Sequence, residues 1–291
     1  MTESLLIRAA PLVFVVLWAT GFVVARLSAG HVEPLTFLAL RFPIAALVML
    51  AIAIQQGAPW PDRTHAWHAG VAGALMHAAY LGPIYWAVTH GLPGGVAALI
   101  VGLQPLITAF LAARFLGDAI SLRHWLGLAV GIVGVGLVLA PKFTLSAANG
   151  ITPLTAGLAL LGAVGISAGT VYQKKFATGL HIASGGFWQY VGGSLIVITG
   201  AVLLEDFGFD GSFEAWFSLG WAVCVLSIAA IMLLMMLIRE GAVARVSGLI
   251  YLVPAVTAVM TYGLFGETLN LVQLGGMVLC TAAVLMVNRT T

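Results

Sequence analysis

The sequence is built of two similar halves, and both copies of the repeated segment lie in apolar runs of membrane-spanning length. Residues 105–127 recur in register at an offset of 149 positions. The matched pairs are Pro105 and Pro254, Thr108 and Thr257, Ala109 and Ala258, Gly117 and Gly266, Asp118 and Glu267, and Gly127 and Gly276. A second segment, Gly21 to Arg26, returns as Gly169 to Lys174 at an offset of 148. The repeat predicts one unit over residues 1–146 and a second over residues 147–291, and carriers of this kind bind their solute between the units.

The composition is that of a protein embedded in lipid. Of the 291 residues, 61% are hydrophobic and only 8% are charged, whereas soluble domains carry about 25% charged residues. A net charge of +2 gives no indication of a nucleic-acid partner. The two cysteines, Cys224 and Cys280, lie in apolar runs without a metal-binding spacing. We therefore expect no metal or other cofactor, and no obligate protein partner.

Ten apolar segments are long enough to cross a bilayer, which takes about 20 residues in a helix. They lie near residues 9–29, 35–55, 68–89, 94–116, 122–140, 153–174, 184–204, 215–238, 243–265 and 270–288. The connections are too short to hold a soluble domain, so the protein must act within the membrane or at its surface. The expected fold class is an all-α membrane protein with ten transmembrane helices.

Ten spans place both termini on the same side of the membrane, and the cations predict that this side is the cytoplasm. With cytoplasmic termini, nine Lys and Arg residues lie at the inner face: Arg8, Arg63, Arg114, Arg123, Lys174, Lys175, Arg239, Arg245 and Arg289. Three lie toward the outer face: Arg26, Arg41 and Lys142. This positive-inside bias predicts a multi-pass protein of the inner membrane.

Each half has five helices, an odd number, so the second half must cross the membrane in the direction opposite to the first. The charges agree with this inversion. The loop after the fourth helix carries Arg114 and Arg123, whereas its counterpart after the ninth helix has no Lys or Arg between Tyr251 and Arg289. Two inverted five-helix repeats are typical of carriers that work by alternating access.

Three features resemble the drug/metabolite transporter superfamily, in particular its ten-helix EamA-type members. They are Trp18-Ala-Thr-Gly-Phe in the first helix, Arg41-Phe in the second, and the two Pro…Gly-acid…Gly blocks of the repeat. The resemblance covers essentially the whole chain and implies a secondary transporter, not an enzyme. Among family members, the aromatic-rich core is similar to bacterial amino-acid exporters of the YddG type. The chain departs from the family pattern at Asp118, where members commonly carry Glu.

Ionisable groups are scarce in the middle of the predicted spans, where such groups are costly and usually functional. No Asp, Glu, Lys or Arg lies in the middle third of a span. Arg41 comes nearest, in the outer part of the second helix, and Gln189 occupies its repeat position. The lack of a membrane carboxylate favours a facilitator. The alternatives for His77, near the centre of the third helix, are a proton relay and a purely structural role.

One stripe of the third helix is suited to line a substrate cavity. Met76, His77, Tyr80 and Ile84 share helical spacing, and thioether and aromatic groups adapt to apolar solutes of varied shape. Ordinary helix packing is the alternative for each residue. Aromatic residues on other helices complete the predicted lining: Trp18, Tyr172, Trp188 and Tyr251.

Glutamines and prolines interrupt the apolar spans. Gln104, Gln173 and Gln189 are predicted to bind the polar groups of a zwitterionic substrate without a fixed charge. Pro105 and Pro254 each remove a backbone donor from a predicted helix. Their duplication predicts a hinge in each half, and a kink that serves packing is the alternative.

Two further patterns have competing interpretations. Arg26 and Lys174 are repeat equivalents near opposite faces, where they either extend to the lipid headgroups or capture a substrate carboxylate at each mouth. The segment Gly165-Ile-Ser-Ala-Gly169 matches the Gly-x-Ser-x-Gly pattern of hydrolases. Because it lies in an apolar helix, we interpret its glycines as a helix contact ridge.

The sequence therefore predicts a secondary transporter that exports small organic metabolites by alternating access, most of all amino acids with aromatic and other apolar side chains. A drug or cationic-compound exporter is the first alternative, although it would favour a carboxylate in the cavity. A nucleotide-sugar or sugar-phosphate carrier would need paired cations for phosphate. An intramembrane enzyme using His77 is the alternative of another class.

Overall fold

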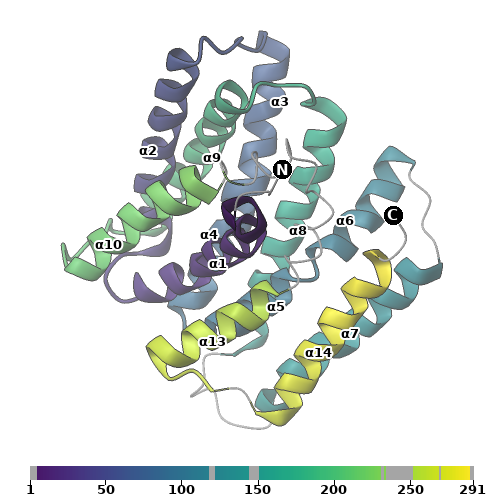
Figure 1. Cartoon of the computed structure of the whole chain (residues 1–291). Helices are drawn as coiled ribbons and strands as arrows, with labels where there is room; N and C mark the ends of the chain where they lie inside the picture. Colours follow the sequence, from purple (N-terminus) through teal and green to yellow (C-terminus); the bar gives the residue numbers. More distant parts are fainter. Residues whose placement is uncertain are drawn as a thin grey trace.

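The computed structural model describes residues 5–117, 122–143, 151–230, 233, 252–268 and 270–288, and this part of the chain is helical apart from its connections (Figure 1). The helices are α1 (Leu5–Leu27), α2 (Pro34–Gln55), α3 (Arg63–Gly73), α4 (Ala79–Thr89), α5 (Gly94–Val101), α6 (Gln104–Leu116), α7 (Leu122–Phe143), α8 (Pro153–Phe176), α9 (Ile182–Leu204), α10 (Phe213–Trp221), α13 (Val253–Phe265) and α14 (Leu271–Asn288). Two segments are π-helical: η1 (Ala74–Ala78) joins α3 to α4, and η3 (Ala222–Ala229) follows α10.

The predicted ten-helix membrane fold is confirmed. Five segments of the described chain are long and apolar enough to cross a bilayer: Pro34–Gln55, Arg63–Thr89, Gly94–Leu116, Pro153–Phe176 and Ile182–Leu204. Five shorter apolar helices supply the rest: Leu12–Leu27, Trp125–Gly134, Phe213–Ala229, Val253–Phe265 and Leu271–Ala283. Residues 234–251, with the predicted end of the eighth helix and start of the ninth, lie outside the described residues, as do Asp118 and the expected boundary between 146 and 147.

The repeat seen in the sequence returns as a repeat of local structure. α6 and α13 have 13 residues each, with Pro105 and Pro254 in their first turns. Both helices end at a glycine with left-handed backbone, Gly117 at φ 77° and Gly266 at φ 67°, which glycine adopts without the steric cost of a Cβ atom. Contrary to expectation, Pro105 does not remove a hydrogen bond from a continuous helix, because residues 102–103 form a turn between α5 and α6. Both prolines are the second residue of a helix, where the missing N–H has no intrahelical partner to lose.

The π-helical segments also lie at equivalent places in the two halves. Ala74 begins η1 and Ala222 begins η3, and the two positions are separated by the repeat offset of 148. π-helical turns are rare and are frequent at functional sites. Since η1 contains Met76 and His77, the third predicted span, formed by α3, η1 and α4, departs from regular α-helical geometry at two of the residues expected to line the cavity.

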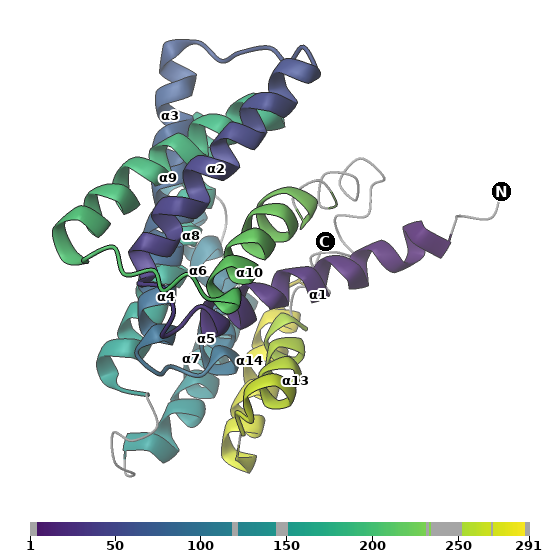
Figure 2. The same cartoon turned by 90° about the vertical axis from the view of Figure 1, so that its left-hand side faces the viewer.

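Equivalent helices of the two halves pack against each other. α7 lies along its equivalent α14, and α2 lies along its equivalent α9, as Figures 1 and 2 show. α5 of the first half packs against α13, the equivalent of α6. α8 packs against α4 and α6, and its counterpart α1 packs against η3 and α13. The packing is therefore pseudo-twofold. α5 contacts α1, α8 and α13, so these four helices form the seam between the halves.

Glycines on α8 make the close helix contacts expected of a contact ridge. A Cβ atom at Gly165 would lie 2.7 Å from the carbonyl oxygen of Ala79, and one at Gly169 would overlap Met76. Small residues let helix backbones approach in this way in a membrane. The ridge holds α8 against η1 and α4, and it thereby fixes one wall of the cavity described below.

Candidate functional site

A cavity of about 210 Å³ lies at the seam between the two halves. Residues of α1, α5, α6, α8 and α13 contribute to its walls, together with Met76 of η1 and Cys280 of α14. Most of the lining is apolar, and the polar groups come from Gln104, Thr170 and Thr281. The lining includes Trp18, Phe22, Met76, Gln104, Pro105 and Pro254.

A second cavity of about 120 Å³ adjoins the first, since Trp18, Phe22, Met76 and Ile166 line both. The whole predicted stripe of the third helix faces this cavity: Met76, His77, Tyr80 and Ile84. Arg41, Tyr85 and Tyr190 supply the remaining polar groups of the wall. The ring of His77 stacks on that of Tyr190, with centroids 4.6 Å apart and planes within 7°.

A third cavity of about 400 Å³ leads from this region to the surface of the protein. It shares His77 and Tyr190 with the second cavity and Thr170 with the first. Its walls include the loop over residues 177–181 and the exposed residue Lys174. The three cavities thus form one row that reaches the surface at the end of the bundle where α8 meets α9. We call this end the open end.

The opposite end of the bundle, which we call the closed end, is held together by polar contacts between the halves. Nε of Arg26 lies 3.3 Å from Oε1 of Glu267, and the other carboxylate oxygen of Glu267 accepts a 3.0 Å hydrogen bond from the Gly94 backbone N–H. Arg26 lies in the last turn of α1, Gly94 begins α5, and Glu267 follows α13. One carboxylate therefore ties three of the four seam helices together.

A second carboxylate joins α2 to the end of α9. Glu205 follows α9 and accepts hydrogen bonds from the backbone N–H groups of Leu35 (2.8 Å) and Thr36 (2.7 Å) and from the Thr36 hydroxyl (2.9 Å). The first N–H groups of a helix have no intrahelical acceptor, and the positive end of the helix dipole favours an anion there. Glu205 of the second half therefore caps a helix of the first.

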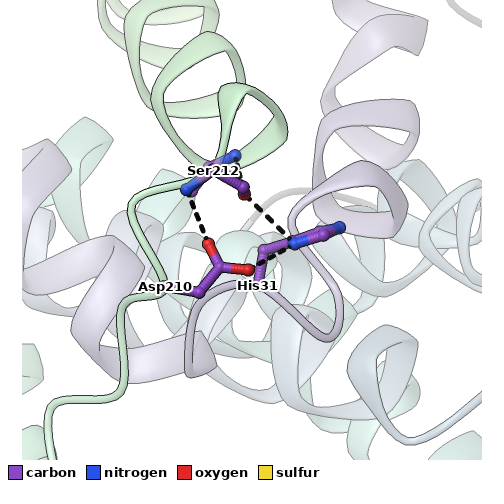
Figure 3. A network of polar contacts seen from close by, with 4 residues as sticks. His31, Asp210 and Ser212 are labelled. Atoms are coloured by element: carbon purple, nitrogen blue, oxygen red, sulfur yellow. Dashed lines mark hydrogen bonds and ion pairs between the residues drawn. The ribbon is translucent and has the colours of Figure 1, made fainter.

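The loops before α2 and after α9 add a third set of contacts at the closed end. Nδ1 of His31 lies 2.6 Å from Oδ2 of Asp210 and 3.1 Å from the Ser212 hydroxyl, as Figure 3 shows. The Ser212 N–H donates to Asp210 (2.9 Å). Hydrogen bonds from Ser212, followed by the one from His31, lower the pKa of Asp210 from 3.8 to about 2. Val32 pairs with Phe209 in an antiparallel bridge beside this network.

Most residues predicted to bind substrate line the row of cavities. They are Trp18, Met76, His77, Tyr80, Gln104, Gln173 and Gln189, together with the two predicted hinge residues Pro105 and Pro254. Tyr172 lies elsewhere, with its hydroxyl 2.7 Å from Nδ1 of His68. Trp188 lines a separate groove between α3 and α9. Tyr251 lies outside the described residues.

Arg41 belongs to the cavity wall although it was not among the predicted binding residues. Its side chain is buried, with 6% of the residue exposed, and it faces the second cavity. The sequence signal was present, because a cation within a membrane span is rarely without a function and Gln189 occupies the equivalent position.

Ser167 is not arranged for hydrolysis, and the described residues hold no cluster suited to a metal ion. Ser167 donates to the carbonyl oxygens of Ala163 (2.7 Å) and Gln104 (3.1 Å) inside helical packing, so its hydroxyl is not presented to a substrate by a strand–turn–helix elbow. No group of three or more His, Cys, Asp or Glu residues in the described chain could hold a metal ion.

Comparison with known proteins identifies relatives of both halves. The family described as the EamA-like transporter family matches residues 6–140 and again residues 154–289. The inner membrane transporter YedA of Escherichia coli K12 is 26% identical over 258 residues, which is 89% of this chain and 82% of YedA. A probable amino-acid metabolite efflux pump of Salmonella typhimurium is 26% identical, covering 93% of this chain and 91% of its own. One solved crystal structure, 18% identical, covers 96% of this chain and 94% of its own with a TM-score of 0.65, which supports the fold.

Proposed function

Because the chain belongs to the EamA-like transporter family, we propose that it exports small organic metabolites by alternating access, most of all amino acids with aromatic and other apolar side chains. Its family and its relatives are transporters, so the chain is a membrane transporter and not an enzyme. The observation that carries the finer proposal is the row of cavities between the halves. It is lined by aromatic and thioether groups and reaches the surface at the open end, while polar contacts join the halves at the other end.

The lining fits a solute with an apolar body and a few polar groups. Trp18, Met76 and Tyr80 offer surfaces that adapt to aromatic and aliphatic side chains. Gln104 and Gln189 lie at different places along the row, where their amides can donate and accept hydrogen bonds. The name of the Salmonella relative, an amino-acid metabolite efflux pump, supports the same substrate class.

The contacts at the closed end form the gate in this proposal. In the orientation predicted from the positive-inside bias, the closed end faces the outside of the cell and the open end faces the cytoplasm. A cytoplasmic solute enters the cavity, the contacts of Glu205 and Glu267 break, and the cavity opens to the outside. We assign residues 1–146 and 147–291 as the two halves that move. The helix starts at Pro105 and Pro254, together with η1 and η3, are the expected places of bending.

The described part of the cavity favours a facilitator over a proton-driven pump. No Asp or Glu of the described chain lines the three cavities, and His77 lies where the second and third cavities meet. The same feature weighs against a drug exporter, because a cationic compound would be stabilised by a carboxylate in the cavity.

Uptake by proteoliposomes tests the proposed function. Purified protein is reconstituted, and uptake of labelled phenylalanine, leucine and a cationic dye is measured with and without an imposed pH gradient. We expect amino-acid uptake that is indifferent to the pH gradient. Gradient-driven movement of the dye without amino-acid flux would instead identify a drug exporter, with His77 as the first candidate for proton coupling.

A further inference from the structure

Arg41 is a buried cation in the wall of a cavity inside the membrane. It lies in α2 with 6% of the residue exposed, and it shares the second cavity with Trp18, Met76 and His77. A cation at this depth is costly and is usually compensated by an anion or retained for function. The partners of Arg41 therefore decide what it does.

The described protein gives Arg41 only neutral partners. Its Nε donates to the Ser227 hydroxyl over 3.3 Å and one terminal nitrogen donates to the Tyr85 hydroxyl over 3.4 Å. Both distances are at the long end for hydrogen bonds, and a guanidinium has five N–H donors. The Phe42 ring lies 6.0 Å from the guanidinium carbon, which is at the limit of a cation–π contact. No carboxylate in the described part of the chain pairs with Arg41.

Arg41 lines a cavity that a small anion can enter. The second cavity adjoins the first at Trp18 and Met76, so a solute with an anionic group near Arg41 would have its apolar body among aromatic and thioether side chains. The planar guanidinium matches a carboxylate in two parallel hydrogen bonds. A single cation suits a singly charged carboxylate better than a phosphate monoester, which carries up to two negative charges.

We propose that Arg41 binds the carboxylate of the transported solute, and that the substrates are monocarboxylates with an apolar or aromatic body. This inference rests on the proposed function and deepens it. Because no Asp or Glu of the described chain lines the cavities, the carboxylate is required for binding and the ammonium group is dispensable. Amino acids and the corresponding acids without an amino group then bind the same site.

A ligand series on the unaltered protein tests the proposal without relying on the folding of a variant. Binding of radiolabelled 3-phenylpropanoate and phenylalanine to purified protein is measured by scintillation proximity. Phenylalaninamide and phenyl phosphate serve as unlabelled competitors. We expect both carboxylates to bind and neither competitor to displace them. Equal competition by the amide, better competition by phenyl phosphate, or no binding of either carboxylate would overturn the assignment.

Substitutions of Arg41 then test whether its positive charge binds the carboxylate. Arg41→Gln should weaken carboxylate binding by at least about 30-fold and abolish the preference for acid over amide, while Arg41→Lys should retain part of that preference. Arg114→Gln, at the exposed end of α6, is the control and should bind as the parent does. Loss of a purely structural role would lower the binding of phenylalanine and of phenylalaninamide alike. If Arg41→Gln still preferred the acid over the amide, Arg41 would therefore be only a packing residue.

The two proposals fail in different ways. Carboxylate binding through Arg41 without amino-acid transport by proteoliposomes would reject the proposed function and leave the site standing. Transport of amino acids and their amides at similar rates would reject the site and leave the function standing.

Discussion

Removal of the Glu205 carboxylate should open the closed end. In Glu205→Ala, the backbone N–H groups of Leu35 and Thr36 and the Thr36 hydroxyl lose their acceptor. A hydrogen bond to a charged group contributes about 1.5–3 kcal/mol, but water replaces part of this at a half-exposed site and the three bonds share one carboxylate. We therefore take roughly 2 kcal/mol as the loss, which corresponds to an increase of about 30-fold in the ratio of open to closed protein.

The assay is the labelling of a cysteine placed in the cavity on the closed side. Ile84 is 1% exposed and lines the second cavity, so Ile84→Cys, in a chain with Cys224 and Cys280 replaced by serine, reports opening. A membrane-impermeant thiol reagent is added to right-side-out vesicles. If the open state is the minor one, the rate of labelling follows its population, and Glu205→Ala should raise that rate by about 30-fold.

The adjacent acid provides a matched control. Asp206 is exposed and makes no hydrogen bond or ion pair in the described part of the chain, so Asp206→Ala should label at the parent rate. Equal rates for Glu205→Ala and the parent would refute the idea that Glu205 holds the end closed. An equal increase in both variants would show that the general loss of negative charge, and not the helix cap, controls opening.

Three further substitutions test other parts of the account. A Cβ atom at Gly73 would overlap the backbone of α9, whereas one at Gly157 would meet nothing within 4 Å, so Gly73→Ala should lower the thermal unfolding temperature in detergent and Gly157→Ala should not. Because the pKa of Asp210 is lowered from 3.8 to about 2, its stabilising contribution is present above about pH 4 and is lost as the pH falls to 2. The difference in unfolding temperature between the parent and Asp210→Asn should therefore disappear over that range. A difference that persists at pH 2 would contradict the lowered pKa of Asp210 as the source of the stabilisation. His77→Ala removes a ring stacked in the cavity wall and should change the rate or range of transport while the protein still inserts, as checked by uptake and size-exclusion elution; transport identical to the parent would exclude a cavity role for His77.

The fold could be predicted from the sequence because the bilayer restricts a chain to few structures. Apolar length predicted the ten spans, and the repeat of Pro105, Gly117 and Gly127 predicted two related halves. The helix breaks could not be predicted in the same way. An apolar run that continues through residues 101–104 resembles one long helix, and only the structure shows α6 beginning at Gln104 with Pro105 in its first turn.

The candidate site could be predicted where it depends on spacing along one helix. Met76, His77 and Tyr80 lie on one wall because a helix places them there, and the π-helical η1 does not remove them from it. Contacts between distant segments were beyond the sequence. Nothing in the pattern of residues relates Glu205 to the start of α2, and nothing distinguishes Trp188, which lines a peripheral groove, from Trp18, which lines the cavity.

Counterflow is the measurement that tests the central claim, that solute passes through the cavity between the halves. Proteoliposomes loaded with unlabelled phenylalanine take up labelled phenylalanine from outside, and three proteins are compared: the parent, Met76→Trp, which fills the space shared by the first two cavities, and Trp188→Leu, which alters only the peripheral groove. The account predicts a transient overshoot of label for the parent and for Trp188→Leu, and none for correctly inserted Met76→Trp. An overshoot of equal size in Met76→Trp, or its loss in Trp188→Leu alone, would contradict a route through this cavity.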